Sequence, residues 1–339
     1  MVNDKCIFLT TPMRSGSSYL SRILSAHPSV DMSYDTFNFF RFCFHKYDPL
    51  TEDNNLRRLI QDMSFRLKNR FEIELNVENC LKSIDENEYT YANAYWNILR
   101  TIFPNVNKTI LGDKESMAWT KIPNFLDMFP NGKAIVLVRD PRDVVSSFKK
   151  ITIAPENDYL IALFNVVDAI NHAVRYETRY PAQVRMVNFE KLKLNPEKEI
   201  KSLCEFLEIN FSPNMLNEDN FTNHSGNKWD QKRSKSYPEE IDPLAPVGRW
   251  KSKLDADDLY LCEIIAKKQI SMIDLQLSGR KFTQDDFESA MNKVMSSRLL
   301  REAYKRWCDT GEGVEQFPLD PTNPSNWDPT GVIKPDVFK

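Results

Sequence analysis

Three short apolar segments, each followed by an amphipathic stretch, constrain the fold of this chain more than any other feature. The apolar segments cover residues 7–9, 133–138 and 184–189, and the amphipathic stretches that follow cover residues 19–24, 141–148 and 196–207. Strands that alternate with helices in this way form a parallel sheet whose faces are covered by helices. We therefore predict an α/β fold built on a parallel sheet.

The region between the first two strands is too long for a simple connection and carries two helical stripes. Apolar residues recur at helical spacing over residues 56–67 and again over residues 91–102. These stripes predict a helical insert at about residues 36–105, within a domain that covers residues 1–280.

The remainder of the chain divides into two parts. We predict a helical segment over residues 281–309 and an irregular tail over residues 310–339. The tail has five prolines in polar sequence, a composition that does not favour a packed core.

Composition excludes several classes of protein. The 45 basic and 48 acidic residues give a net charge of −3, which argues against a surface devoted to nucleic acid. No apolar run is long enough to span a membrane. The 6 cysteines are far apart and form no Cys-x-x-Cys pair, which fits neither a zinc site nor a disulfide scaffold. We expect a reduced, cytoplasmic protein.

The loop between the first strand and its helix has the composition of an anion site. It contains an arginine, a glycine, three serines and a proline: Arg14, Gly16, Ser15, Ser17, Ser18 and Pro12. The first amides of a helix lack internal partners and the helix dipole favours negative charge there. A Walker A loop would need a lysine after the glycine, and none is present. The alternative is a serine-rich turn that only caps the helix.

A second candidate anion loop follows the strand at residues 133–138. Asp140-Pro141 predicts a helix start, because aspartate caps open amides and proline is tolerated at the first helical position. Arg139 and Ser147 could bracket a phosphate, whereas we interpret Arg142 and Asp143 as a cap and a surface ion pair. Ligands collect at the carboxyl ends of parallel strands, so both loops should face one crevice. Two anion loops suggest a nucleotide with phosphates at both ends.

At this point the sequence resembles the sulfotransferases that use 3′-phosphoadenosine 5′-phosphosulfate (PAPS). The matching segments are residues 12–18, the Arg139–Ser147 segment, Val187–Leu192, Cys204–Ile209 and Val247–Lys251. The resemblance covers roughly residues 5–275. It is closer to protein-tyrosine and broad bacterial sulfotransferases than to the cytosolic phenol and steroid enzymes. Those enzymes have a lysine in the first loop and a catalytic histidine where this chain has Gly112–Glu115.

The resemblance implies a P-loop-like fold and a role for each matching residue. The loop of residues 12–18 would hold the 5′-phosphosulfate, with Arg14 at the bridging oxygen. Lys114 matches a lysine that stabilises the transferring sulfuryl group, with a surface lysine as the alternative. The 3′-phosphate would be held by Arg139, Ser147 and Arg249, and Gly248 and Trp250 would help to close over the nucleotide. Adenosine 3′,5′-bisphosphate would be released, and no metal is required.

A hydroxyl acceptor needs a general base within hydrogen-bond reach. Asp35 stands where the resembling enzymes have a glutamate, and Glu115 is the second candidate. For both, the alternative is a solvated loop carboxylate. The nearby phenylalanines from Phe37 to Phe44 could line an acceptor pocket, although we favour their role as core.

The resulting prediction is a sulfotransferase that moves a sulfuryl group from PAPS to a hydroxyl or amine. The sequence does not identify the acceptor or the oligomeric state. Two alternatives stay open. A nucleotide kinase would share the sheet and the first loop but would depend on magnesium and ATP, and a non-catalytic protein would bind the nucleotide without turnover.

Overall fold

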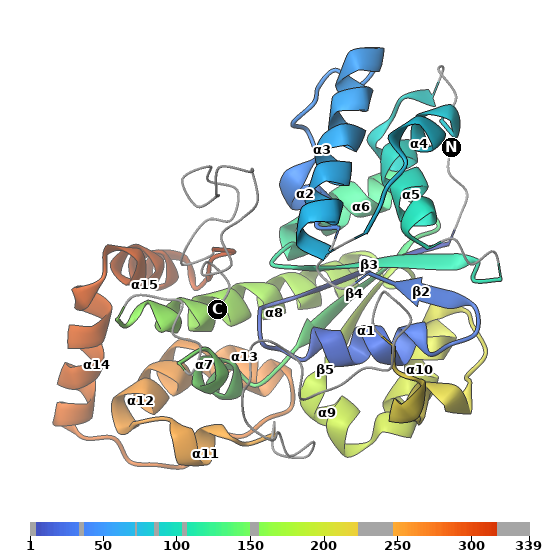
Figure 1. Ribbon diagram of the computed structural model, residues 1–339. Coiled ribbons are helices and arrows are strands. Elements are labelled where there is room, and N and C mark those ends of the chain that lie inside the picture. Colours follow the sequence, from blue (N-terminus) through green and yellow to red (C-terminus); the bar gives the residue numbers. More distant parts are fainter. Residues whose placement is uncertain are drawn as a thin grey trace.

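The computed structural model describes seven stretches of the chain. They are residues 5–33, 37–71, 73–84, 88–103, 107–149, 156–222 and 247–316. Within them, five parallel strands form one sheet in the order β2-β3-β1-β4-β5 (Figure 1). The strands are β1 (Cys6–Thr11), β2 (Val30–Met32), β3 (Ile110–Ser116), β4 (Lys133–Val138) and β5 (Val184–Asn188). The prediction of an α/β fold with a parallel sheet is confirmed.

Two of these strands were not predicted from the sequence. The segments at residues 7–9, 133–138 and 184–189 correspond to β1, β4 and β5, whereas β2 and β3 lie just before and just after the predicted helical insert. β2 has only 3 residues, and β3 reads ILGDKES, with three adjacent charged residues that are all buried. Neither segment has the apolar run that marks a buried strand. β3 nevertheless lies beside β1 near the centre of the sheet.

Helices cover both faces of the sheet. One face packs against α1 (Ser17–Ser25), α9 (Phe189–Leu194) and α10 (Pro196–Leu207), and the other packs against α5 (Tyr91–Ile102), α6 (Ile122–Met128) and α8 (Ile161–Arg179). Successive strand side chains point to opposite faces. Phe8 therefore belongs to the α8 face and Leu9 to the α1 face, and both are fully buried.

The insert is helical, as the two stripes predict. It contains α2 (Phe39–Phe42), α3 (Asp53–Phe71), α4 (Val77–Lys82) and α5, which rise together above the sheet in Figure 1. The rings of Phe37 and Phe39 lie 4.8 and 5.0 Å from the ring of Tyr95, and that of Phe40 lies 5.2 Å from that of Phe8. These three phenylalanines are buried, so their interpretation as core is confirmed.

The last part of the chain packs beside α7 (Pro141–Lys149) and α8. It contains α11 (Trp250–Lys253), α12 (Ala256–Ile265), α13 (Lys267–Met272), α14 (Gln284–Ser296) and α15 (Arg298–Thr310). Short 3₁₀ turns lie at Trp119–Lys121, Asp158–Leu160, Pro213–Leu216 and Glu218–Asn220. Among the described residues, no helix combines the length and apolar character needed to cross a membrane.

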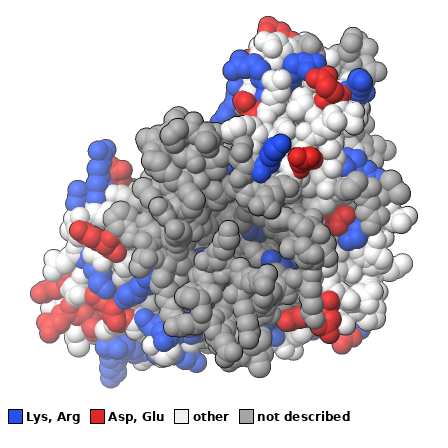
Figure 2. Space-filling model, viewed as in Figure 1, with Lys and Arg blue, Asp and Glu red and all other residues white. Residues whose placement is uncertain are grey.

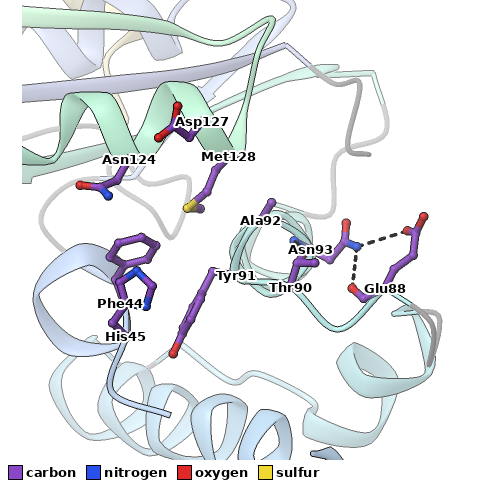
Figure 3. Close-up of a pocket in the computed structure, with 10 residues that line it drawn as sticks. All are labelled: Phe44, His45, Glu88, Thr90, Tyr91, Ala92, Asn93, Asn124, Asp127 and Met128. Carbon is purple, nitrogen blue, oxygen red and sulfur yellow. Dashed lines mark hydrogen bonds between the residues drawn. The ribbon is translucent and has the colours of Figure 1, made fainter. Parts of the chain in front are cut away.

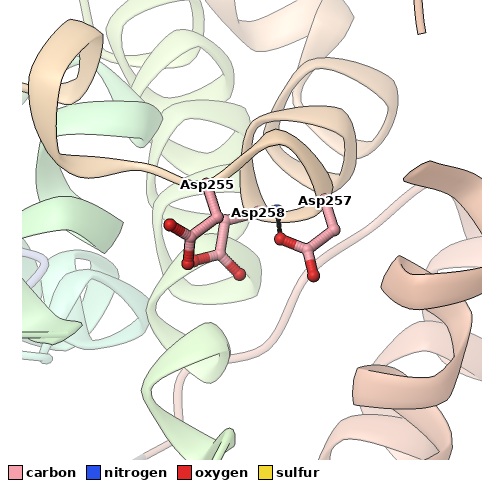
Figure 4. Close-up of side chains that lie close together, drawn as sticks. All are labelled: Asp255, Asp257 and Asp258. Carbon is pink, nitrogen blue, oxygen red and sulfur yellow. Dashed lines mark hydrogen bonds between the residues drawn. The ribbon is translucent and has the colours of Figure 1, made fainter. Parts of the chain in front are cut away.

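Three aspartates gather at the start of α12 (Figure 4). Asp258 is fully buried and accepts hydrogen bonds from Lys149 at 2.8 Å, from Lys293 at 2.7 Å and from the hydroxyl of Tyr159 at 2.8 Å. Asp255 pairs with Lys149 and Asp257 with Lys293. The cluster is therefore a set of ion pairs that joins α12 to α7 and α14.

The start of the expected tail, residues 311–316, is neither helix nor strand but is bound to the domain. The carboxylate of Glu315 accepts hydrogen bonds from the amide of Thr120 at 3.0 Å and from its hydroxyl at 3.1 Å. Asn165 of α8 exchanges two hydrogen bonds with the backbone of Gln316, at 2.9 and 3.0 Å. A Cβ at Gly313 would lie 1.9 Å from the carbonyl oxygen of Phe164, so glycine permits this close approach.

Candidate functional site

The carboxyl ends of β1 and β4 form the natural ligand position of this sheet. The two strands are neighbours, with Thr10 opposite Val136. The chain leaves β1 towards β2 on one side of the sheet and leaves β4 towards β5 on the other. Parallel sheets bind ligands where neighbouring connections diverge in this way. Both predicted anion loops, which begin after Thr11 and after Val138, start at this point.

The loop after β1 is shaped around Gly16. This residue has φ +92°, and a Cβ there would lie 2.2 Å from the ring of Phe189. Glycine is therefore required twice, for the left-handed backbone and for the packing. Gly16 is the N-cap of α1, and no described side chain caps that helix. The first amides of α1 thus keep their capacity to bind an anion.

The serines of this loop differ in exposure. The side chain of Ser15 is fully buried, and its hydroxyl has no hydrogen-bond partner among the described residues. Ser17 is buried and Ser18 is exposed. A buried hydroxyl without a partner is costly unless a ligand or water completes it. Ser15 is therefore well suited to contact a ligand, and Pro12 is buried at the end of β1.

Side chains from the two loops meet. Nε of Arg14 donates to Oγ of Ser147 at 3.3 Å, and Nη1 of Arg139 donates to the backbone carbonyl of Arg14 at 2.8 Å. Oγ1 of Thr11 also donates to the carbonyl of Leu137 at 2.9 Å, which joins the ends of β1 and β4. The expectation that the two loops face the same space is confirmed by these contacts.

Three guanidinium groups share this space, which we call the arginine site (Arg14, Arg139, Arg249 and Ser147). The pKa of Arg14 is lowered to about 10, first by burial and then by the charges of Arg139 and Arg249. Burial also lowers the pKa of Arg139, although Asp143 and Glu190 act in the opposite direction. Like charges that lie close together and away from water repel one another, which raises the free energy of the site. An anion at this place would lower it.

The positive charge is local. On the face in Figure 2, basic and acidic side chains are mixed over the described residues rather than gathered into one basic field. This mixture agrees with the net charge of −3. A site for a small anion fits this pattern better than a nucleic-acid surface does.

Arg249 reaches the arginine site from a turn of residues 247–250, which we call the Arg249 turn. The carboxylate of Asp143 accepts hydrogen bonds from the amides of Gly248 at 2.8 Å and Trp250 at 2.9 Å. The guanidinium of Arg142 lies 4.1 Å from the ring centroid of Trp250. The turn is therefore attached to α7 at two places.

The start of α7 confirms one prediction and corrects another. The amide of Arg142 donates to Oδ1 of Asp140 at 2.9 Å, so Asp140 caps the helix as expected. The surface ion pair expected for Arg142 and Asp143 is wrong, because both side chains are buried, at 2% and 0% exposed. Arg142 pairs with Asp140 and with Glu263 of α12, at 2.8 Å each. Sequence periodicity could not reveal partners so far along the chain.

Two residues after β5 were missed. Phe189 packs on Gly16, and the guanidinium of Arg139 lies 4.9 Å from its ring centroid. Oε1 of Glu190 accepts the amide hydrogen of Asp140 at 3.0 Å, and Oε2 is buried with no partner among the described residues. Burial raises the pKa of Glu190 to about 7. Their position directly after a strand is the signal that could have found them.

Lys114 and Glu115 lie at the end of β3, on opposite faces of the sheet. Lys114 is opposite Leu9 of β1 and is 2% exposed, so its interpretation as a surface lysine is wrong. The two oxygens of Glu115 accept the amide hydrogens of Phe40 at 3.1 Å and Arg41 at 3.0 Å. Glu115 thus holds the start of α2. Asp35, the first candidate base, lies outside the described residues.

A separate cavity of about 520 Å³ lies between the insert and α6 (Figure 3). Phe44, Tyr91 and Met128 contribute apolar groups to its wall, and Asn124 of α6 contributes an amide. The amide of Asn93 donates to Glu88 at the edge of the cavity. None of the residues that line it belongs to the arginine site.

Comparison with known proteins agrees with this geometry. The model of the sulfotransferase family matches residues 6–213, more than half of the chain and both loops of the site. The chain belongs to the sulfotransferase family. The resemblance stated from the sequence motifs is therefore confirmed, and the protein is an enzyme of the sulfotransferase type.

Two curated relatives and one solved structure are similar to this chain. A Caenorhabditis briggsae protein provisionally named a protein-tyrosine sulfotransferase is 23% identical over 301 residues, which cover 85% of this chain and 97% of the relative. The protein-tyrosine sulfotransferase of Drosophila melanogaster is 23% identical over 260 residues, 74% of this chain and 48% of the relative. The chain thus spans about half the length of the fly protein. The sulfotransferase domain from the curacin biosynthetic pathway shares the fold, with a TM-score of 0.54, 20% identity, and coverage of 81% of this chain and 99% of that domain.

Proposed function

We propose that this sulfotransferase uses PAPS as its donor and transfers the sulfuryl group to a hydroxyl or amine. The observation that carries the proposal is the contact between the two loops, in which Arg14 binds Ser147 and Arg139 binds the backbone of Arg14. The adenosine of PAPS carries a phosphate at its 3′ position and a phosphosulfate at its 5′ position. A site with two adjacent anion loops fits such a molecule, whereas a simple phosphate ester would need one loop.

The residues present fit this donor. The buried hydroxyl of Ser15, the α1 amides that no described side chain caps, and Arg14 would hold the 5′-phosphosulfate. Arg139, Ser147 and Arg249 would hold the 3′-phosphate, with Gly248 and Trp250 supporting Arg249. The lowered pKa of Arg14 supports the assignment, because a bound anion would relieve the repulsion between the arginines.

The donor supplies the sulfuryl group, and the chain supplies position and charge. Negative charge develops on the leaving phosphate during such a transfer, and fixed cations in a desolvated site stabilise it. We assign this role to Arg14. To Lys114, which is buried at the end of β3, we assign the stabilisation of the transferring sulfuryl group. The donor requires no metal in this scheme, since the side chains provide the positive charge.

The acceptor proton needs a base, and we propose Asp35 for that role. Glu115 is the less favourable candidate, because both of its oxygens accept backbone hydrogens of α2. When such a carboxylate takes a proton on one oxygen, it loses the hydrogen bond that this oxygen accepts from the backbone of the helix. Glu115 therefore suits a positioning role, in which it fixes α2 beside the end of β3.

The names of the relatives suggest the first acceptor to test, a tyrosine hydroxyl in a polypeptide. We also propose a reducing, cytoplasmic setting for the protein. The support is that all six cysteines are free thiols and that five of them are buried singly in the core.

Calorimetric titration tests the donor assignment. We expect adenosine 3′,5′-bisphosphate to bind without metal, and more tightly than ATP with magnesium. A preference for magnesium ATP would instead support a nucleotide kinase. Incubation with labelled PAPS and a tyrosine peptide then tests turnover, with Arg14→Ala as the comparison. Tight binding of the bisphosphate with no labelled product from peptides, phenols, alcohols or amines would support a non-catalytic binder.

A further inference from the structure

Asp143 lies between two parts of the arginine site that are far apart in sequence. It is on the first turn of α7 and is fully buried. Its carboxylate lies 3.8 Å from Nη2 of Arg139 and accepts the amide hydrogens of Gly248 and Trp250. The Asp143 carboxylate therefore contacts Arg139, which would bind the 3′-phosphate. It also contacts the backbone on either side of Arg249, the second cation that would bind this phosphate.

The Arg249 turn needs such an attachment. Arg249 is close enough to Arg14 and Arg139 for its charge to lower the pKa of both. Like charges in a buried site repel one another, so the turn that brings the third arginine is pushed outwards. Gly248 has φ +73°, a conformation that no ordinary side chain favours. Hydrogen bonds from two amides to a carboxylate are strong enough to oppose these costs.

We propose that Asp143 is the positioning residue that presents Arg249 to the 3′-phosphate of the donor. Asp143 touches no donor atom in this proposal and acts through the backbone of the Arg249 turn. The same carboxylate also contacts the guanidinium of Arg139. Asp143 therefore fixes the position of the turn and at the same time balances part of the positive charge of Arg139. The inference rests on the proposed function, since it concerns how that donor is held.

A double-mutant cycle in binding of adenosine 3′,5′-bisphosphate tests the proposal. Asp143→Asn keeps the size of the side chain but removes its charge and one of its two acceptor oxygens. We expect it to weaken binding by about 10- to 100-fold, the range for hydrogen bonds to a charged group. In an Arg249→Ala background the same change should cost less than about threefold, because only the 3.8 Å contact with Arg139 is then left for Asp143 to act through. Equal losses in the two backgrounds would overturn the proposal.

Kinetics give a second readout that a general loss of structure would not imitate. If Asp143 acts only on donor binding, Asp143→Asn raises the KM for PAPS and leaves kcat within about twofold. A loss confined to kcat would contradict the proposal. Asp255→Asn is the matched control, because Asp255 also pairs with a side chain of α7 but lies outside the arginine site. It should leave bisphosphate binding unchanged.

Gly248→Ala provides an independent variant if Asp143→Asn does not fold. An added Cβ meets nothing closer than 3.8 Å, so the change strains only the backbone of the turn and removes no charge. We expect binding to weaken by about 3- to 10-fold, with no further loss when Arg249 is already alanine. Unchanged binding in Gly248→Ala would then reject the proposal. If the unmodified protein does not bind the bisphosphate at all, the proposed function fails, whereas normal binding by Asp143→Asn rejects only the role of Asp143.

Discussion

The two sides of the site are built differently. On the donor side, Arg14 and Arg139 follow directly after neighbouring strands, and their side chains meet because parallel strands end at one edge of the sheet. On the insert side, Glu115 binds backbone amides of α2 that are 74 and 75 residues away in sequence. The positions of Arg14 and Arg139 are therefore determined by local sequence and sheet topology. The insert side depends on how a whole helical unit docks, and this difference predicts how each side responds to substitution.

The largest effect should come from Arg14→Ala. The variant removes a partly buried cation that also binds Ser147. Removing one preorganised donor of this kind typically costs about 10²–10³ in rate. We expect kcat/KM for sulfuryl transfer to fall by that factor, measured with labelled PAPS. Transfer within threefold of the unmodified protein would remove Arg14 from the donor side altogether.

Gly16→Ala should be the most destabilising small change in the donor side. The new Cβ would meet the ring of Phe189 at 2.2 Å and the residue would keep φ +92°. Overpacking and backbone strain together cost about 3 kcal/mol. Urea unfolding measures this loss. Gly279→Ala is the control, because it has φ +73° with nothing within 4 Å of an added Cβ, and it should cost only about 1 kcal/mol. Equal losses would mean that the packing on Phe189 is unimportant.

Glu115→Gln should affect the insert side and leave binding on the donor side almost unchanged. The amide side chain has one oxygen in place of two, so one buried backbone amide of α2 loses its partner at a cost of about 1–3 kcal/mol. We expect lower stability and a raised KM for the acceptor, whereas the affinity for adenosine 3′,5′-bisphosphate stays within about twofold. If bisphosphate binding falls as steeply as acceptor KM rises, the two sides are not independent.

Glu190, on the donor side, should make the stability of the folded protein depend on pH. Burial raises the pKa of Glu190 from 4.5, the ordinary value of a glutamate side chain, to about 7 in the folded protein. A carboxyl whose folded pKa is raised contributes stability that is present below pH 4.5 and is lost as the pH rises to about 7. The unmodified protein should therefore lose about 1–3 kcal/mol over this interval relative to Glu190→Gln. Urea unfolding at pH 5, 6, 7 and 8 measures the difference, and parallel curves would exclude this role of Glu190.

The same contrast explains which parts of the molecule were predictable. The β4 strand, the Asp140 cap and the α10 helix follow from apolar runs, capping chemistry and helical spacing, all of which act between neighbours in sequence. Arg14 and Arg139 were found because they lie in the loops that follow β1 and β4. These features need no knowledge of distant packing.

The features that were missed depend on distant partners. β3 is charged at its centre, where Glu115 binds the backbone of α2 and Asp113 accepts a hydrogen bond from the hydroxyl of Ser33, so it has no strand-like pattern. Asp143 has its hydrogen-bond partners on the Arg249 turn, more than 100 residues further on. Lys114 and Glu190 are charged residues in the interior, and such residues are rarely buried without a specific partner. Their environment is a property of the assembled fold.

The segment 311–316 has a practical consequence for anyone who shortens the chain. Cutting the polypeptide at Thr310, where α15 ends, would remove the Glu315 carboxylate from Thr120 and the Gln316 backbone from Asn165. The lost contacts lie on α8 and on the turn after β3, and α8 packs against β4, the strand that leads to Arg139. A trimmed version intended for crystallisation or ligand screening should therefore retain at least Gln316.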